Sequence, residues 1–309
     1  MPLKALKKDT PEALTLEWVL HIKNYRLSLD KKTCVGCQIC SLACPKEAIK
    51  VEKQVKNQSE KARKPKVDID LSKCNFCGIC DVLCPYGAIK VTLNGQHLLS
   101  ILEKESFPQL IRDIQIDPSK YVPRKEREEI CPLNLIATSL SMPDGKTVTD
   151  TGSLTKKQKA ALQVKIDVDK EHCPCCRICE FKFPQGVVQV RKFIQGKMTI
   201  NSEKCPENCE DCLDVCPITG ALYISEDDKK VHVNETFCVY CGACRVVCPV
   251  DEALELKRTR IIHTPVKSGA WNKALERITS PIEMTKELKA KGSQKAMESV
   301  ERLMVPKRD

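Results

Sequence analysis

Aromatic residues make up only 4% of this 309-residue chain, and histidine occurs five times. Large aromatic side chains therefore add little to a core, and no Ser/His/Asp arrangement, phosphate-binding loop or dinucleotide fingerprint is present. No run of 18 apolar residues occurs, which argues against a membrane-spanning helix. The start of the chain also lacks the apolar core of a secretory signal. We therefore expect a non-catalytic protein of the cytoplasm.

What the chain has instead is cysteine, at 21 residues. In a reducing compartment, cysteines are more often metal ligands or catalytic thiols than disulfides. The hydrophobic fraction of 42% includes these cysteines, so fewer carbon side chains are available for a core than that figure suggests. Because metal binding supplies folding free energy directly, we interpret the cysteines as thiolate ligands that organise the fold.

The cysteines fall into clusters that repeat one spacing. Three clusters read C-x2-C-x2-C-x3-C followed by proline, and a fourth has one extra residue in its first gap. Before each cluster, apolar residues two positions apart precede Asp or Asn, as at Leu27, Leu29 and Asp30, and predict a strand that turns into the loop. After each Cys-Pro, an apolar pair such as Ala48-Ile49 predicts a second strand. The cysteines are Cys34, Cys37, Cys40 and Cys44; Cys74, Cys77, Cys80 and Cys84; Cys205, Cys209, Cys212 and Cys216; and Cys238, Cys241, Cys244 and Cys248.

The same template finds two incomplete copies in the middle of the chain. One has lost its fourth cysteine, and its neighbour has lost the first three. Their four positions are Cys173, Cys176, Cys179 and Phe183 in one copy, and Tyr121, Arg124, Arg127 and Cys131 in the other.

This spacing is the signature of bacterial ferredoxins that bind [4Fe–4S] clusters, in which the fourth cysteine ligates the other cluster of a pair. Applied to adjacent motifs, the rule predicts five clusters, which use 20 of the 21 cysteines and leave Cys175. The expected ligand sets are Cys34, Cys37, Cys40 and Cys84; Cys74, Cys77, Cys80 and Cys44; Cys173, Cys176, Cys179 and Cys131; Cys205, Cys209, Cys212 and Cys248; and Cys238, Cys241, Cys244 and Cys216.

The two incomplete motifs complement each other under this rule. Phe183 stands where the fourth ligand of a sixth cluster would be, and the other three ligands of that cluster are also missing. We therefore expect no cluster at Tyr121, Arg124 and Arg127. Cys175 is interpreted as a spare thiol, with an alternative ligand or a redox-sensitive thiol as the other possibilities. His172 is a weaker candidate ligand, because a complete cysteine set is already present.

Two other classes of protein are weighed against an iron–sulfur protein. Structural zinc uses pairs of C-x2-C and needs neither a third cysteine at this spacing nor a trailing Cys-Pro. Nucleic-acid binding is suggested by the net charge of +10. However, five oxidised clusters held by four thiolates would add about −10, which brings the loaded protein near neutrality. Interleaved aromatic platforms for bases are also missing.

We predict an α+β fold of tandem bacterial-type 2[4Fe–4S] ferredoxin-like modules. Modules 1 and 3 each carry two clusters, and the degenerate module 2 carries one. The expected bounds are 1–23 for an N-terminal extension, 24–95 for module 1, 110–192 for module 2, 193–260 for module 3 and 261–309 for a helical docking tail.

Two segments depart from the repeat. Module 2 contains a Ser/Thr/Gly/Lys-rich stretch, and we expect an exposed insertion at about 138–163. In the tail, AWNKALERITS and PIEMTKELKA predict helices, the second beginning at Ser280-Pro281. Such a helix would either dock onto a partner or pack back on its own module.

The phrases between the motifs carry a resemblance. The runs PKVDIDLSKCNFCGICDVLCPYGAIKVTLNG, FPQLIRDIQIDPSK and VKSGAWNKALERITS resemble the polyferredoxin subunit of archaeal formylmethanofuran dehydrogenase, over roughly residues 24–280. The resemblance implies relay of low-potential electrons to or from a tungsten or molybdenum subunit, in methanogenesis or its reverse. The family typically has eight motifs, whereas this chain has six motif positions.

The resemblance also implies partners. They are the other subunits of a formylmethanofuran dehydrogenase complex, with a ferredoxin, a hydrogenase or a heterodisulfide reductase as electron partner. A polyferredoxin of a hydrogenase or heterodisulfide reductase complex is the alternative, because the cysteine motifs are common to all polyferredoxins. A zinc-stabilised scaffold or nucleic-acid-binding protein is the alternative of another class.

Overall fold

The computed structural model describes residues 2–54, 62–121, 130–143, 146, 148, 155, 162–250, 252–266 and 270–279. In this part of the chain, one strand precedes each of the six motif positions and another strand follows it. The strands predicted from the apolar residues on either side of the loops are therefore confirmed.

Module 1 closes because its two motifs exchange strands. The strand before the first motif, β3, pairs antiparallel with the strand after the second, β6, so that Leu29 lies opposite Ile89. The strand after the first motif, β4, pairs with β5 in front of the second, so that Ile49 lies opposite Ile69. The elements are β3 (Asn24–Asp30), α1 (Ile39–Ala43), β4 (Ile49–Glu52), β5 (Lys66–Ile69), α2 (Ile79–Val82) and β6 (Ile89–Leu93).

Module 2 repeats this exchange although most of one motif's cysteines are gone. β7 pairs with β10, and β8 pairs with β9. A short helix, α3 (Ser100–Glu103), leads from module 1 toward it. The elements are β7 (Asp113–Ile116), a 3-10 turn (Pro118–Lys120), β8 (Ile136–Ser141), β9 (Gln163–Val168), α5 (Ile178–Lys182) and β10 (Val188–Arg191).

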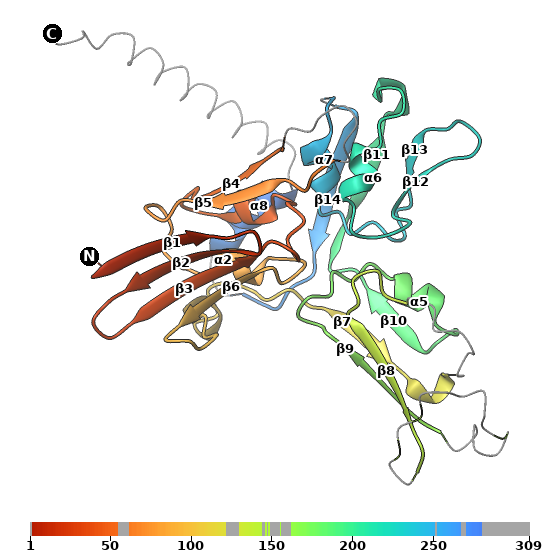
Figure 1. The fold of residues 1–309 in the computed structure, drawn as a ribbon, viewed down its shortest axis with the longest axis horizontal. Coiled ribbons are helices and arrows are strands. Elements are labelled where there is room, and N and C mark those ends of the chain that lie inside the picture. Colours follow the sequence, from red (N-terminus) through yellow and green to blue (C-terminus); the bar gives the residue numbers. More distant parts are fainter. Residues whose placement is uncertain are drawn as a thin grey trace.

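Module 3 has the same topology, with β11 paired to β14 and β12 paired to β13. Each module thus joins two neighbouring motifs, and Figure 1 shows the three modules as adjoining parts of the molecule. The elements are β11 (Ile194–Ile200), a 3-10 turn (Ser202–Lys204), α6 (Asp211–Val215), β12 (Leu222–Ile224), β13 (Val231–Val233), α7 (Ala243–Val247) and β14 (Leu254–Ile261).

The N-terminal extension is a β-hairpin that widens the sheet of module 1. β1 (Lys4–Asp9) and β2 (Ala13–Val19) give a four-stranded sheet of order β1-β2-β3-β6 (Figure 1). Alternate residues of β2 face inward, and Leu14 and Leu16 are buried beside Leu27 and Leu29 of β3. This hairpin therefore covers one side of module 1.

The tail helix α8 (Ala270–Thr279) packs on the protein itself. It contacts α1 of module 1 and β14 of module 3. Trp271, Ala274 and Ile278 lie on one face and are buried in a core shared by all three modules. The helix predicted for AWNKALERITS is confirmed, and of the two roles considered it packs inward, across two modules. The helix predicted from Ser280-Pro281 lies outside the described residues.

The expected insertion in module 2 begins later than predicted. β8 continues to Ser141 and pairs with β9, with Ser141 opposite Gln163. Residues 138–141 are therefore part of a hairpin stem, because their alternating side chains continue the strand. Most of the remaining insertion lies outside the described residues.

We expect Trp271→Ala to lower the free energy of unfolding by about 3 to 5 kcal/mol, the usual cost of removing a buried aromatic side chain. The Trp271 ring packs edge-on against Phe107, with centroids 5.2 Å apart, and its Nε1 donates to His263 Nε2 at 2.9 Å. Denaturant unfolding of the anaerobic protein measures the change. Ile22→Ala, at a side chain 86% exposed, is the control and should change the midpoint little. Equal midpoints for the two variants would contradict the packing role of α8.

Candidate iron–sulfur cluster sites

The loops that carry the first three cysteines share a strained backbone geometry. In four of them the second and fourth residues after the first cysteine have positive φ, between 54° and 91°. Non-glycine residues adopt this conformation at a cost, so it marks a functional loop. The residues are Gly36 and Gln38, Phe76 and Gly78, Cys175 and Arg177, and Tyr240 and Gly242.

This geometry directs backbone amides at the sulfurs. The amides of Gly36, Phe76 and Tyr240 hydrogen-bond to the thiols of Cys34, Cys74 and Cys238, and each bond lowers the pKa of its thiol. Hydrogen bonds to a thiolate stabilise the charged form that a metal requires. The loops are therefore built to hold thiolates.

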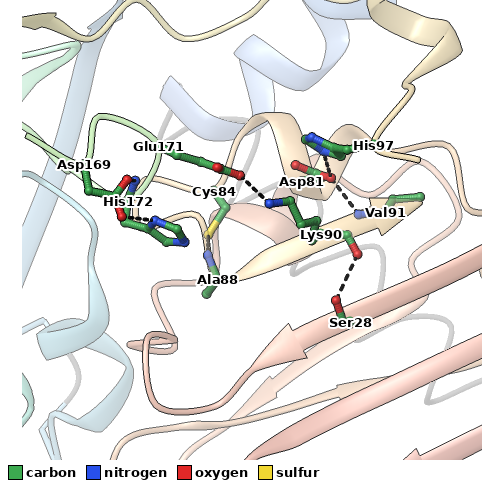
Figure 2. Close-up of polar contacts among 10 residues, drawn as sticks. All are labelled: Ser28, Asp81, Cys84, Ala88, Lys90, Val91, His97, Asp169, Glu171 and His172. Carbon is green, nitrogen blue, oxygen red and sulfur yellow. Dashed lines mark hydrogen bonds and ion pairs between the residues drawn. The ribbon is translucent and has the colours of Figure 1, made fainter. Parts of the chain in front are cut away.

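A short helix then separates the third and fourth motif positions. The third cysteine lies in the helix, and the fourth position follows at or just past its end. Two of the fourth cysteines also accept hydrogen bonds from backbone amides. Ala48 N donates to Cys44 Sγ at 3.4 Å, and Ala88 N donates to Cys84 Sγ at 3.2 Å; Figure 2 shows the second pair. The fourth thiol is thus carried away from its own loop and held in a position of its own.

The structure brings the 20 candidate cysteines into five groups. Burial is the largest cause that raises the pKa of Cys40, Cys80, Cys179, Cys212 and Cys244, one in each group, and the negative charge of cysteines in the same group adds to it. Each group takes three cysteines from one motif and one from the partner motif. The groups are Cys34, Cys37, Cys40 with Cys84; Cys74, Cys77, Cys80 with Cys44; Cys173, Cys176, Cys179 with Cys131; Cys205, Cys209, Cys212 with Cys248; and Cys238, Cys241, Cys244 with Cys216.

Burial is the largest cause of the raised pKa at three of these cysteines. Burial raises the pKa of Cys34 and Cys238 to about 11, and that of Cys216 to about 12. At neutral pH such thiols are protonated in the absence of metal. Metal binding must then displace their protons, as is usual for thiolate sites.

Three of the five groups line enclosed cavities, and the lining residues fit an iron–sulfur cluster. Within the described residues, no three His, Cys, Asp or Glu side chains converge closely enough to bind a single metal ion. A [4Fe–4S] cluster places each thiolate on a different iron, so its ligands surround a larger space. The cysteines in the cavity walls are Cys44, Cys74, Cys77 and Cys80; Cys131, Cys173, Cys176 and Cys179; and Cys216, Cys238, Cys241 and Cys244.

Cys175 stands at the left-handed loop position that Gly36, Phe76 and Tyr240 occupy elsewhere. Its side chain is fully buried. The Cys175 thiol hydrogen-bonds to Cys173, and this bond is the main cause that lowers the pKa of Cys173 to about 7. The twenty-first cysteine therefore occupies a position that is not a ligand position in the other loops.

His172 is engaged by a carboxylate. Its Nδ1 lies 2.7 Å from Asp169 Oδ2 (Figure 2). Asp169 is the turn residue that precedes the loop, and its Oδ1 accepts a hydrogen bond from the His172 amide at 3.3 Å. Asp169, in the turn before the loop, thus orients the His172 ring.

An aromatic pair lies where the repeat would place a sixth cluster. Tyr121 replaces the first cysteine of its motif and Phe183 the fourth of the partner motif. Their rings meet edge to face, with centroids 5.8 Å apart at 70°. Such pairs stabilise a contact beyond the area they bury. Arg124 and Arg127 lie outside the described residues.

Comparison with known families matches both intact modules. Residues 33–88 and residues 197–249 each match a family described as 4Fe-4S dicluster domain. These ranges contain the loops of modules 1 and 3. The fold is accordingly that of tandem ferredoxin-like modules with mixed strand and helix content.

Curated relatives are similar over part of the chain. Hydrogenase-4 component A of Escherichia coli is 33% identical over 85 residues, which are 25% of this chain and 40% of that protein. The polyferredoxin-like subunit of aliphatic sulfonate oxidoreductase of Pyrococcus furiosus is 31% identical over 99 residues, which are 28% of this chain and 55% of that protein. The chain thus spans about half the length of the curated relatives it matches.

One solved structure is similar over nearly the whole chain. It is a chain of the formate dehydrogenase–heterodisulfide reductase–formylmethanofuran dehydrogenase complex from Methanospirillum hungatei. The TM-score is 0.72 at 26% identity, and the match covers 90% of this chain and 92% of that chain. The chain is thus similar to 4Fe-4S dicluster domains over parts of modules 1 and 3, and similar in fold to one chain of this complex over nearly its whole length. No helix in the described residues has the length and apolar character needed to span a bilayer.

The cross-motif grouping predicts opposite results for two cysteines of module 2. We expect Cys131→Ala to lose about four iron atoms per chain, because the fourth ligand of one cluster is removed. Cys175→Ala is the matched control in the same module and should keep the wild-type iron content. Iron and acid-labile sulfide of the anaerobically purified proteins give the answer. A loss of iron in the Cys175 variant with none in the Cys131 variant would overturn the grouping.

Proposed function

We propose that the chain is a non-catalytic electron-transfer subunit that carries five [4Fe–4S] clusters, each held by one of the five cross-motif groups of cysteines. The observation that carries this proposal is the grouping itself, since three thiols from one motif meet one thiol from its partner in every group. This is the ligand arrangement of two-cluster ferredoxins. A bound cluster of this type takes up and gives back one electron.

The residues of the chain would tune that chemistry through burial and hydrogen bonding. Cys37, Cys40 and Cys80 are buried, and burial disfavours the extra negative charge of the reduced state. Hydrogen bonds from backbone amides to sulfur, such as that from Ala88 N to Cys84 Sγ, favour the reduced state. The balance of these two effects sets the reduction potential of each site. The buried sites suit low-potential electrons.

We further propose that the partner is a formylmethanofuran dehydrogenase. The polyferredoxin would relay electrons to or from its tungsten or molybdenum subunit, which reduces CO2. Two observations support this: the runs between the motifs resemble its polyferredoxin subunit, and the structural relative that matches 90% of the chain comes from a complex whose name includes that enzyme. A complex of this kind would operate in the cytoplasm, where thiolates stay reduced.

A relay for a hydrogenase or heterodisulfide reductase complex is the second candidate. It is favoured by the similarity of one part of the chain to Hydrogenase-4 component A. That similarity covers a quarter of this chain, whereas the solved relative covers 90% of it. The first candidate therefore explains more of the sequence.

Anaerobic affinity purification of the tagged protein from its native host, with mass spectrometry of the bound proteins, tests the partner. We expect a pterin-containing tungsten or molybdenum subunit together with an amidohydrolase-like subunit. Recovery of hydrogenase or heterodisulfide reductase subunits without them would keep the electron relay and overturn the named enzyme.

The iron content tests the number of clusters. Because Tyr121 and Phe183 fill the sixth position, we expect about 20 iron atoms per chain, four for each of five clusters. The measurement is iron per polypeptide, with protein quantified by amino-acid analysis. A value near 24 would mean that a cluster forms at the sixth position after all, and the aromatic pair would then have to separate.

A further inference from the structure

The ligand loops of modules 1 and 3 touch each other directly. After burial, the charge of Cys241 in module 3 is the strongest cause that raises the pKa of Cys37 in module 1. Gly242 shows how close the backbones are, because a Cβ at this residue would lie 3.7 Å from the carbonyl oxygen of Cys37. Two groups of thiols, far apart in sequence, therefore share one boundary.

A buried cation lies at this boundary. Arg258 of β14 is only 5% exposed. It donates to the carbonyl oxygens of Tyr240 at 2.8 Å, Cys241 at 2.6 Å and Ile278 at 3.2 Å. The charges of Cys37 and Cys241 both act on it. The guanidinium thus stands as a fixed positive charge beside thiols of both modules, locked in place by α8.

Tyr86 reaches across the same boundary. It follows Cys84-Pro85 in module 1, yet it lines the cavity formed by the cysteines of module 3, which are Cys216, Cys238, Cys241 and Cys244. The residue is 2% exposed, and its hydroxyl has no hydrogen-bond partner in the described part of the chain. A buried hydroxyl without a hydrogen-bond partner destabilises a protein, so its presence in a native structure calls for an explanation.

The surroundings of the hydroxyl point to sulfur as that partner. Tyr86 lines the same cavity as Cys216, Cys238, Cys241 and Cys244. A tyrosine hydroxyl is protonated at neutral pH and can donate a hydrogen bond. Cys241, Cys37 and Cys216 are among its charged neighbours, so the hydroxyl lies among thiols of both modules.

We propose that the Tyr86 hydroxyl donates a hydrogen bond to the sulfur of Cys241 when that thiolate holds its cluster, and that electrons cross between modules 1 and 3 at this junction. The inference rests on the proposed function. One electron leaves a cluster in one module and arrives at the cluster in the other, with no bond formed or broken. Tyr86 and Arg258 both stabilise the added negative charge, and donors to sulfur raise the reduction potential.

The test is an anaerobic redox titration of the complete protein followed by electron paramagnetic resonance. Tyr86→Phe removes only the hydroxyl, and we expect one component to move to lower potential. A change of about tenfold in its equilibrium constant corresponds to about 59 mV for a one-electron couple. Tyr25→Phe is the matched control, because that ring belongs to the same module and packs on Phe76 instead. It should leave every component in place.

A second variant moves the same component in the other direction. Difluorotyrosine incorporated at position 86 is a stronger hydrogen-bond donor, so the component should shift to higher potential. Iron content equal to wild type in both variants shows that they fold and load. If neither variant moves any component, Tyr86 does not donate to a cluster and the inference is wrong.

Failure of this inference is distinguishable from failure of the proposed function. Cys216→Ala should remove the same component together with about four iron atoms per chain. If Cys216→Ala loses neither, no cluster is held by this group, and the proposed function fails at this site. If it loses both while Tyr86→Phe changes nothing, only the role of Tyr86 is refuted.

Discussion

When four thiols lie together in a buried site, burial and mutual repulsion disfavour their thiolate forms. Much of the structure around each site stabilises those thiolates. Burial and mutual repulsion raise the pKa of Cys176 to about 11 and that of Cys212 to about 12. Without metal, thiols with such pKa values would keep their protons at neutral pH. The left-handed loop positions matter because they turn amide hydrogens toward the sulfurs and so favour the thiolate.

The excess of Lys and Arg is used at the boundaries between modules. Arg112 donates to the carbonyl oxygens of Cys84 and Cys173, each at 3.0 Å, and so joins loops of modules 1 and 2. Lys192 donates to the carbonyl of Cys238 at 2.8 Å; burial lowers its pKa, and the charges of Cys238 and Cys176 offset part of that effect. With Arg258 between modules 1 and 3, each boundary has a cation beside negative sites. Positive charge therefore helps to hold the modules together around their thiols.

Two pairs of the scarce aromatic residues also make contacts between elements that are distant in sequence. Trp271 packs on Phe107 beneath α8, and Tyr121 packs on Phe183 where the repeat would place a sixth cluster. A cluster at that position would link two motifs covalently. The two rings make an edge-to-face contact between the same two motifs, in the half of module 2 where β7 pairs with β10.

The parts of the fold that could be predicted from the sequence are those that short sequence patterns determine. Cysteine spacing and period-two apolar residues predict the strands around each motif, because both act over a few residues. The hairpin β1–β2 lies outside the cysteine repeat, so the repeat does not predict it, although Leu14 and Leu16 alternate with polar residues. The extension of β8 to Ser141 is not predicted either, because the composition of the insertion is typical of a loop.

Other features have no local signal at all. Nothing near Tyr86 indicates that its hydroxyl lies among the thiols of module 3, because Cys241 is more than 150 residues away. In the sequence, Arg258 is one of two basic residues in the run Lys257-Arg258, and nothing nearby predicts its burial. The burial arises only from the tertiary structure. The clusters of the individual modules can be predicted from spacing, whereas the contacts between modules require the fold.

Anomalous scattering at the iron edge from crystals of the anaerobically purified protein tests the central claim most directly. The account predicts five compact iron peaks, each between three cysteines of one motif and the fourth cysteine of its partner, and no iron between Tyr121 and Phe183. Iron bound within single motifs, or a peak between those two rings, would contradict it.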